Sequence, residues 1–169
     1  TRNTGATVNF GTASIAWTDN ANVNGILGGW APLGNEWAIN STGLGDGPIT
    51  ALATYQAGTL PGAWLSTDNV KISAALAGYS GNQSVNSLNF ATAGLTLNQT
   101  GGTTLTITSG GILSSVNARI AGGILNGAGG ADLILIPAAA TTMTIASLIA
   151  DNGGATALTK SGAGTLILS

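Results

Sequence analysis

The chain has 169 residues, of which 6% are charged, and its formal net charge is −2. The four basic residues form no patch and flank no long apolar span, which argues against nucleic acid, a membrane span and an anionic membrane surface. Hydrophobic residues make up 44% of the chain and 27 residues are glycine, so the low charge indicates a thin, turn-rich, all-β body rather than disorder.

Residues 1–70 are predicted to form an irregular N-terminal cap or junction region. Short strands are expected there at 7–10, 14–18, 36–39 and 49–55. Three of the four prolines lie in this region, and so do all four tryptophans, Trp17, Trp30, Trp37 and Trp64. Because the end of a stack of coils exposes core and backbone, we interpret these bulky residues mainly as a cover for that end.

Residues 71–169 are predicted to form the regular part of the fold. Glycine-rich turns separate short strands expected at 70–74, 84–90, 95–99, 103–108, 112–116, 119–121, 124–125, 132–136, 142–148, 157–160 and 165–168. The sequence Gly-Gly-Ile-Leu at 110–113 returns at 122–125, which indicates a degenerate repeat without one strict period.

Strands at this spacing fit either a β-sandwich or a β-solenoid. No aromatic residue follows Phe90, so little in the second half would fill a wide sandwich core. Leucine, isoleucine and alanine suit a narrow stacked interior, and asparagine and threonine recur near the corners. We therefore predict an all-β solenoid with an aromatic-rich N-terminal region.

The last thirteen residues, 157–169, form two short alternating strands around a Gly-Ala-Gly corner at 162–164. Their sequence, LTKSGAGTLILS at 158–169, closely resembles the autotransporter-associated β-strand repeat. The resemblance implies a right-handed parallel β-helix in a secreted or bacterial cell-surface protein. The family pattern continues with further rungs that this chain lacks, so either a longer polypeptide or a self-completing subunit is expected.

No catalytic constellation is apparent. Because histidine and cysteine are absent, a Ser-His-Asp triad, a cysteine nucleophile and the usual zinc site are impossible. Asp132 and Asp151 are the one acidic pair near the spacing of a coil, and turn roles are favoured over a polysaccharide-acting site. Oxygen ligands for calcium could gather at Asp19, Asn20 and Asn22, or at Asp151 and Asn152, but plain Asx turns are the favoured interpretation. We expect no enzyme activity, metal or cofactor.

The sequence offers two further side-chain chemistries. Lys71 and Lys160 could form isopeptide cross-links with an asparagine beside a buried acid, but solvent-facing lysines are the favoured interpretation. Trp30 and Trp37 could form a platform on which sugar rings stack, although a cap or junction role is favoured for them as well.

The leading functional prediction is a non-enzymatic structural protein, secreted or at the bacterial cell surface. Its last rung, with Leu166 and Leu168, is expected to leave an unpaired strand edge and an uncovered core. Head-to-tail self-assembly into a filament or matrix would cover this edge, with the receiving end formed by Trp17, Trp30, Trp37 and Trp64. The alternative is a carbohydrate-binding adhesin fragment of a longer autotransporter-like protein, with glycans as partners.

Overall fold

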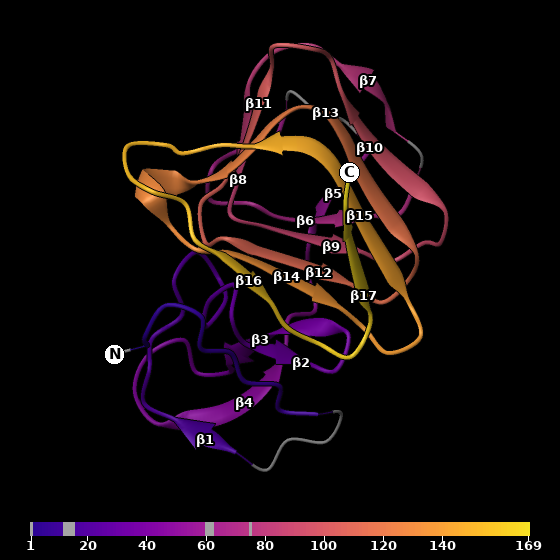
Figure 1. The fold of residues 1–169 in the computed structure, drawn as a ribbon. Helices are drawn as coiled ribbons and strands as arrows, with labels where there is room; N and C mark the ends of the chain where they lie inside the picture. Colours follow the sequence, from indigo (N-terminus) through magenta and orange to yellow (C-terminus); the bar gives the residue numbers. More distant parts are fainter. Residues whose placement is uncertain (1, 12–15, 60–62, 75) are drawn as a thin grey trace.

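The computed structural model describes residues 2–11, 16–59, 63–74 and 76–169, and within these ranges it contains no α-helix. The chain folds into a parallel β-solenoid of about four turns and an N-terminal antiparallel half-barrel (Figure 1). The all-β class and the solenoid architecture predicted from the sequence are therefore confirmed.

The half-barrel is built from residues early in the chain. Its antiparallel strands lie in the order β1 (Trp17–Thr18), β4 (Gly47–Ala51), β3 (Glu36–Asn40) and β2 (Pro32–Leu33). The segment predicted as a strand at 7–10 lies beside them, and the Val8 amide donates to the Trp30 carbonyl oxygen at 3.1 Å, but it is not a strand. Of the strand predicted at 14–18, residues 14 and 15 lie outside the described residues.

The solenoid consists of two sheets whose strands all pair in parallel. The first sheet contains β5 (Gln56–Ala57), β6 (Asn69–Ile72), β9 (Ser87–Phe90), β12 (Gly111–Ser114), β14 (Leu133–Pro137) and β16 (Leu158–Lys160). The second sheet contains β7 (Leu76–Tyr79), β10 (Leu95–Gln99), β13 (Ala118–Gly127), β15 (Thr142–Ile149) and β17 (Thr165–Leu168). It also includes β8 (Gln83–Val85) and β11 (Thr104–Ile107), and a short 3₁₀ turn, η1 (Ala128–Gly130), follows β13.

Coil length varies along the solenoid. On the first sheet the register joins Val70 to Leu88, Leu88 to Ile112, Ile112 to Leu135 and Leu135 to Lys160. These partners are separated by 18, 24, 23 and 25 residues in turn. The differences are absorbed in the turns, which explains why the sequence repeat has no strict period.

The solenoid interior is narrow and mostly aliphatic. Inward-facing side chains stack at paired positions from coil to coil, as in the second-sheet series Leu97, Ile120, Ile145 and Leu168. Among the described residues, aromatic side chains enter this core only from its first coils, at Trp64, Tyr79 and Phe90. This arrangement agrees with the absence of aromatic residues after Phe90.

The observed strands differ from the predicted ones at two corners of the solenoid. At one corner a predicted strand is split, and at the other two predicted strands form one. The strand predicted at 84–90 is divided into β8 and β9 by a corner at Asn86, whose buried side chain donates to Asn69 Oδ1 at 2.8 Å. The strands predicted at 119–121 and 124–125 belong to one bent strand, β13. At its bend Gly122 has φ +71°, and a Cβ there would clash with the Gln99 carbonyl oxygen.

The half-barrel packs on the outer face of the first sheet (Figure 1). The indole of Trp37 lies in a cluster with three outward-facing side chains of β12 and β14, namely Leu113, Ile134 and Ile136. Gly111 permits the close approach, since a Cβ at this position would lie 2.7 Å from Trp37 Cη2. With both faces covered, β14 is buried throughout, which explains its uninterrupted apolar sequence LILIP.

Candidate functional site

The last strands in the two sheets are β16 and β17. Together with the exposed side chain of Leu148, they form the surface that we call the open edge. Within the described residues β16 pairs only with β14 and β17 only with β15, so one side of each strand has no ladder partner. Leu168 is the register partner of inward-facing Ile145 and continues its stack, and it is 53% exposed. A hollow of about 390 Å³ lies there, lined by Ile145, Ala146, Ser147, Leu148, Ile149, Leu168 and Ser169.

The opposite end of the solenoid is closed over its core. The rings of Trp64 and Tyr79 meet edge-to-face, with centroids 6.3 Å apart, and both side chains are buried. The Trp64 Nε1 donates to the Ala57 carbonyl oxygen at 3.2 Å, which anchors the ring beside β5. The strands β5 and β7 form the margins of their sheets at this end. Leu65, the residue after Trp64 in the chain, is exposed.

The tryptophans proposed as one receiving surface are dispersed. Trp17 on β1 is 63% exposed, Trp30 is half-buried, Trp37 is fully buried on the flank and Trp64 is buried in the first coils. Trp37 does not cover the end of the coil stack; it lies on the outer face of the first sheet, where the half-barrel joins the solenoid, so of the cap and junction roles it has the second. The platform of Trp30 with Trp37 is not formed, since no face of Trp37 is accessible.

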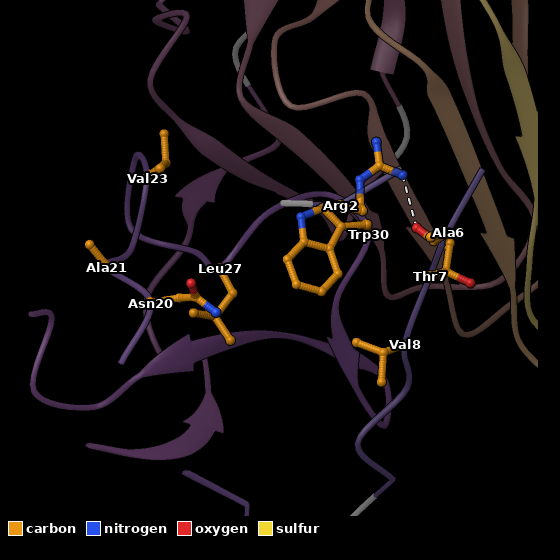
Figure 2. Close-up of a pocket in the computed structure, with 9 residues that line it drawn as sticks. All are labelled: Arg2, Ala6, Thr7, Val8, Asn20, Ala21, Val23, Leu27 and Trp30. Carbon is orange, nitrogen blue, oxygen red and sulfur yellow. Dashed lines mark hydrogen bonds between the residues drawn. The ribbon is translucent and has the colours of Figure 1, made fainter. Parts of the chain in front are cut away.

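A pocket of about 510 Å³ opens between the N-terminal segment and the half-barrel (Figure 2). Its lining combines apolar and polar groups from Arg2, Ala6, Thr7, Val8, Asn20, Ala21, Val23, Leu27 and Trp30. The guanidinium of Arg2 is held at its margin, where Nη1 donates to the Ala6 carbonyl oxygen at 2.8 Å. The Trp30 ring faces this space, so an aromatic surface, a cation and an amide meet in one concave site.

The acids singled out in the sequence hold the backbone at corners. Asp132 is buried and accepts hydrogen bonds from Thr159 Oγ1 at 2.8 Å and from the Gly5 amide at 3.0 Å, and it forms an ion pair with Arg2. Asp151 is exposed and accepts from the Thr156 amide at 2.8 Å. None of these contacts joins the two carboxylates. Asp151 makes a local contact within its own loop, whereas Asp132 connects the N-terminal segment to β16 and makes no turn contact of the expected kind.

The predicted calcium ligands lie in irregular segments between the strands. Asn20 donates to Thr18 Oγ1, while Asn22 exchanges hydrogen bonds with the backbone of Asn40. In the described ranges, no group of three or more Asp, Glu, His or Cys residues is placed to hold a metal ion.

A polar cluster between β3 and the first sheet was not predicted. Glu36 contacts both Lys71 and Asn89, and Tyr55 lies against the same group. Lys71 was the only member singled out from the sequence, because the others come from segments far away along the chain. The only available signal was that Lys71 and Asn89 occupy outward positions of two adjacent predicted strands.

Comparisons with protein-family models, with curated proteins and with solved structures returned no match to this chain. No helix long and apolar enough to cross a membrane occurs among the residues that the structure describes. The fold and the sites described above are therefore the basis for assigning a function.

Proposed function

We propose that this chain is a non-enzymatic extracellular structural protein that assembles head-to-tail with further copies of itself through the open edge. One observation carries the proposal: inward-facing Leu168 is half exposed above the core, on a strand with one unpaired side. Unpaired N–H and C=O groups on such an edge favour the addition of another strand. The resemblance of 158–169 to the autotransporter-associated β-strand repeat supports a place outside the cell.

The occupant that best fits the open edge is the opposite end of a second copy. Both solenoid sheets run from one end of the molecule to the other, so β17 of one copy can meet β7 of the next in the same parallel direction. Exposed Leu65, which follows Trp64 of the closed end, is an apolar side chain that could pack against Leu168. The contact joins two different surfaces and does not close on itself, so it generates a filament.

Assembly is tested by light scattering during size-exclusion chromatography over a concentration series, followed by electron microscopy. We expect the apparent mass to rise with concentration and filaments about as wide as one solenoid. The Leu168→Lys variant places a charge on the open edge and should remain monomeric. Leu44→Lys changes an exposed leucine of the half-barrel and is the matched control. A monodisperse monomer of the unaltered chain at every concentration would sink the proposal.

Carbohydrate binding is the second candidate, and the pocket containing Trp30 is the observation that favours it. Indole faces stack on the apolar faces of sugar rings, while Arg2 and Asn20 offer hydrogen-bond donors at the same site. A panel of oligosaccharides titrated against tryptophan fluorescence tests this role. Trp30→Ala should abolish binding, whereas Trp17→Ala should preserve it. Equal loss in both variants, or no binding to any saccharide, would count against the pocket.

A further inference from the structure

Lys71 and Asn89 lie side by side on neighbouring coils of the first sheet. They are register partners on the parallel strands β6 and β9. Their neighbours Val70, Ile72 and Leu88 point into the solenoid core, so strand alternation directs Lys71 and Asn89 to the outer face. This is the face that the half-barrel covers, and the two side chains therefore meet beneath β3.

Glu36 on β3 bridges these two residues with one carboxylate. Its Oε1 lies 2.6 Å from Lys71 Nζ, and its Oε2 accepts a hydrogen bond from Asn89 Nδ2 at 3.1 Å. The same Nδ2 donates to the Asn35 carbonyl oxygen at 3.0 Å and lies 3.4 Å from the Tyr55 hydroxyl. Because three acceptors surround this position, it is the nitrogen of the Asn89 amide, and not its oxygen, that faces Glu36.

The cluster is shielded unevenly from solvent. Asn89 is 1% exposed, and its Oδ1 is buried with no hydrogen-bond partner among the described residues. Lys71 Nζ lies 4.5 Å from the centroid of the Tyr55 ring, and the side chains of Lys71 and Glu36 are 29% and 32% exposed. Burial raises the pKa of the Tyr55 hydroxyl, so this group stays protonated beside the carboxylate.

We propose that Lys71 and Asn89 become joined by an intramolecular isopeptide bond, with Glu36 carrying the proton between them. The chain would thus hold its first two solenoid coils together covalently beneath the half-barrel. Both reacting side chains contact the carboxylate of Glu36 and stand at paired positions, and the bond needs no oxidant, cofactor or second protein.

The chemistry balances within these three residues. Glu36 takes a proton from the Lys71 ammonium group, and the free amine attacks Cγ of Asn89. The C–Nδ2 bond then breaks as the new C–Nζ bond is completed. The leaving nitrogen takes up protons from the attacking amine and from Glu36, and departs as ammonium. Glu36 returns to its carboxylate form, so one amide replaces another with the loss of one ammonia.

Proximity lowers the barrier to the attack. Fixing an amine beside a carbonyl carbon replaces an encounter between molecules by a step within one molecule. No described residue donates to Asn89 Oδ1, where negative charge develops during the attack. We therefore expect a single slow maturation of each molecule rather than rapid formation on folding.

The second lysine of the chain, Lys160, can be compared with Lys71. Lys160 is exposed, and its Nζ donates to the Gly162 carbonyl oxygen at 2.8 Å. A simple surface ion pair would account for the contact between Lys71 and Glu36. A surface ion pair would not explain why the buried amide of Asn89, on the strand next to that of Lys71, contacts the same carboxylate. Isopeptide formation is therefore assigned to Lys71 and not to Lys160.

Intact-mass spectrometry of the purified chain tests the inference, immediately after purification and after prolonged incubation. We expect the mass to fall by one ammonia, about 17 Da, and peptide mapping to identify a cross-link between Lys71 and Asn89. Lys160→Arg should show the same loss. Glu36→Gln should retain the full mass while its circular dichroism shows a folded β protein.

Asn89→Asp provides a second reading, because the same attack on an acid releases water and lowers the mass by about 18 Da. Full mass of the unaltered chain after incubation, with no cross-linked peptide, would overturn the inference. A loss of ammonia that persists in Glu36→Gln, or that maps to another residue, would overturn it equally.

Discussion

At the scale of single residues, buried amides hold the irregular parts of this fold together. Asn40 is fully buried in the half-barrel, where its Nδ2 donates to the carbonyl oxygens of Thr18, Asn20 and Gly45 at 2.7–3.2 Å. Its Oδ1 accepts from the amide and hydroxyl of Thr42. One side chain thus satisfies backbone groups that no strand ladder reaches, as the physics of buried polar groups requires.

Removal of this amide should destabilise the half-barrel strongly. Asn40→Ala leaves three carbonyl oxygens and an amide without their partner, and we expect a loss of about 3 kcal/mol in the free energy of unfolding. Urea denaturation followed by circular dichroism measures the loss. Asn98→Ala, at an exposed position of β10, should change the stability by less than about 0.5 kcal/mol. Equal effects of the two substitutions would contradict the role given to Asn40.

The chain's two tyrosines should make the fold sensitive to alkali. Burial raises the pKa of both the Tyr55 and Tyr79 hydroxyls above the ordinary value of 10.0. Below pH 10 both hydroxyls are protonated in the folded and unfolded chains, so they add no pH dependence there. Above it the unfolded chain loses protons first, and stability falls as pH rises. Tyrosinate absorbance should therefore appear together with unfolding, and ionisation of both tyrosines in an intact fold would contradict this.

At the scale of elements, the first sheet differs from the second because both of its faces are covered. Its inner face packs in the solenoid core and its outer face packs on the half-barrel. The strand β14 is buried along its whole length, whereas β15 alternates between buried and partly exposed positions. Burial on both faces makes an apolar run favourable where alternation would otherwise be expected.

Trp37 is the main contact between the half-barrel and the solenoid. Trp37→Ala should cost about 3–5 kcal/mol, since a fully buried indole is replaced by a cavity. Limited proteolysis should then cleave the half-barrel before the solenoid coils. Trp17→Ala removes an exposed indole and should leave both stability and cleavage unchanged. Simultaneous cleavage of both parts in Trp37→Ala would show that this contact does not join two separable units.

At the scale of the whole molecule, the two solenoid ends are chemically unequal. Trp64 and Tyr79 close the core at one end, and the open edge exposes Leu168 at the other. The head-to-tail assembly that we propose would therefore give a filament with two unlike ends. Because only 6% of residues are charged, strand pairing and apolar burial dominate the contact that we propose.

Assembly should consequently depend little on ionic strength. We expect the concentration at which filaments form to change by less than about twofold between 0.01 and 1 M sodium chloride, although the Debye length falls about tenfold over this range. Light scattering across a salt series measures it. A steep loss of assembly with added salt would show that ion pairs, rather than β17 and Leu168, hold the copies together.

The sequence by itself determined the all-β class, the solenoid and most strand positions after residue 70. Alternation assigns residues to inner and outer faces locally, which is why β10, β15 and β17 match their predicted ranges closely. Only the tertiary structure decided which outer face is covered. That choice buried Trp37 and brought Glu36 onto Lys71 and Asn89. Such contacts join segments tens of residues apart, and they depend on how whole elements pack rather than on any local pattern.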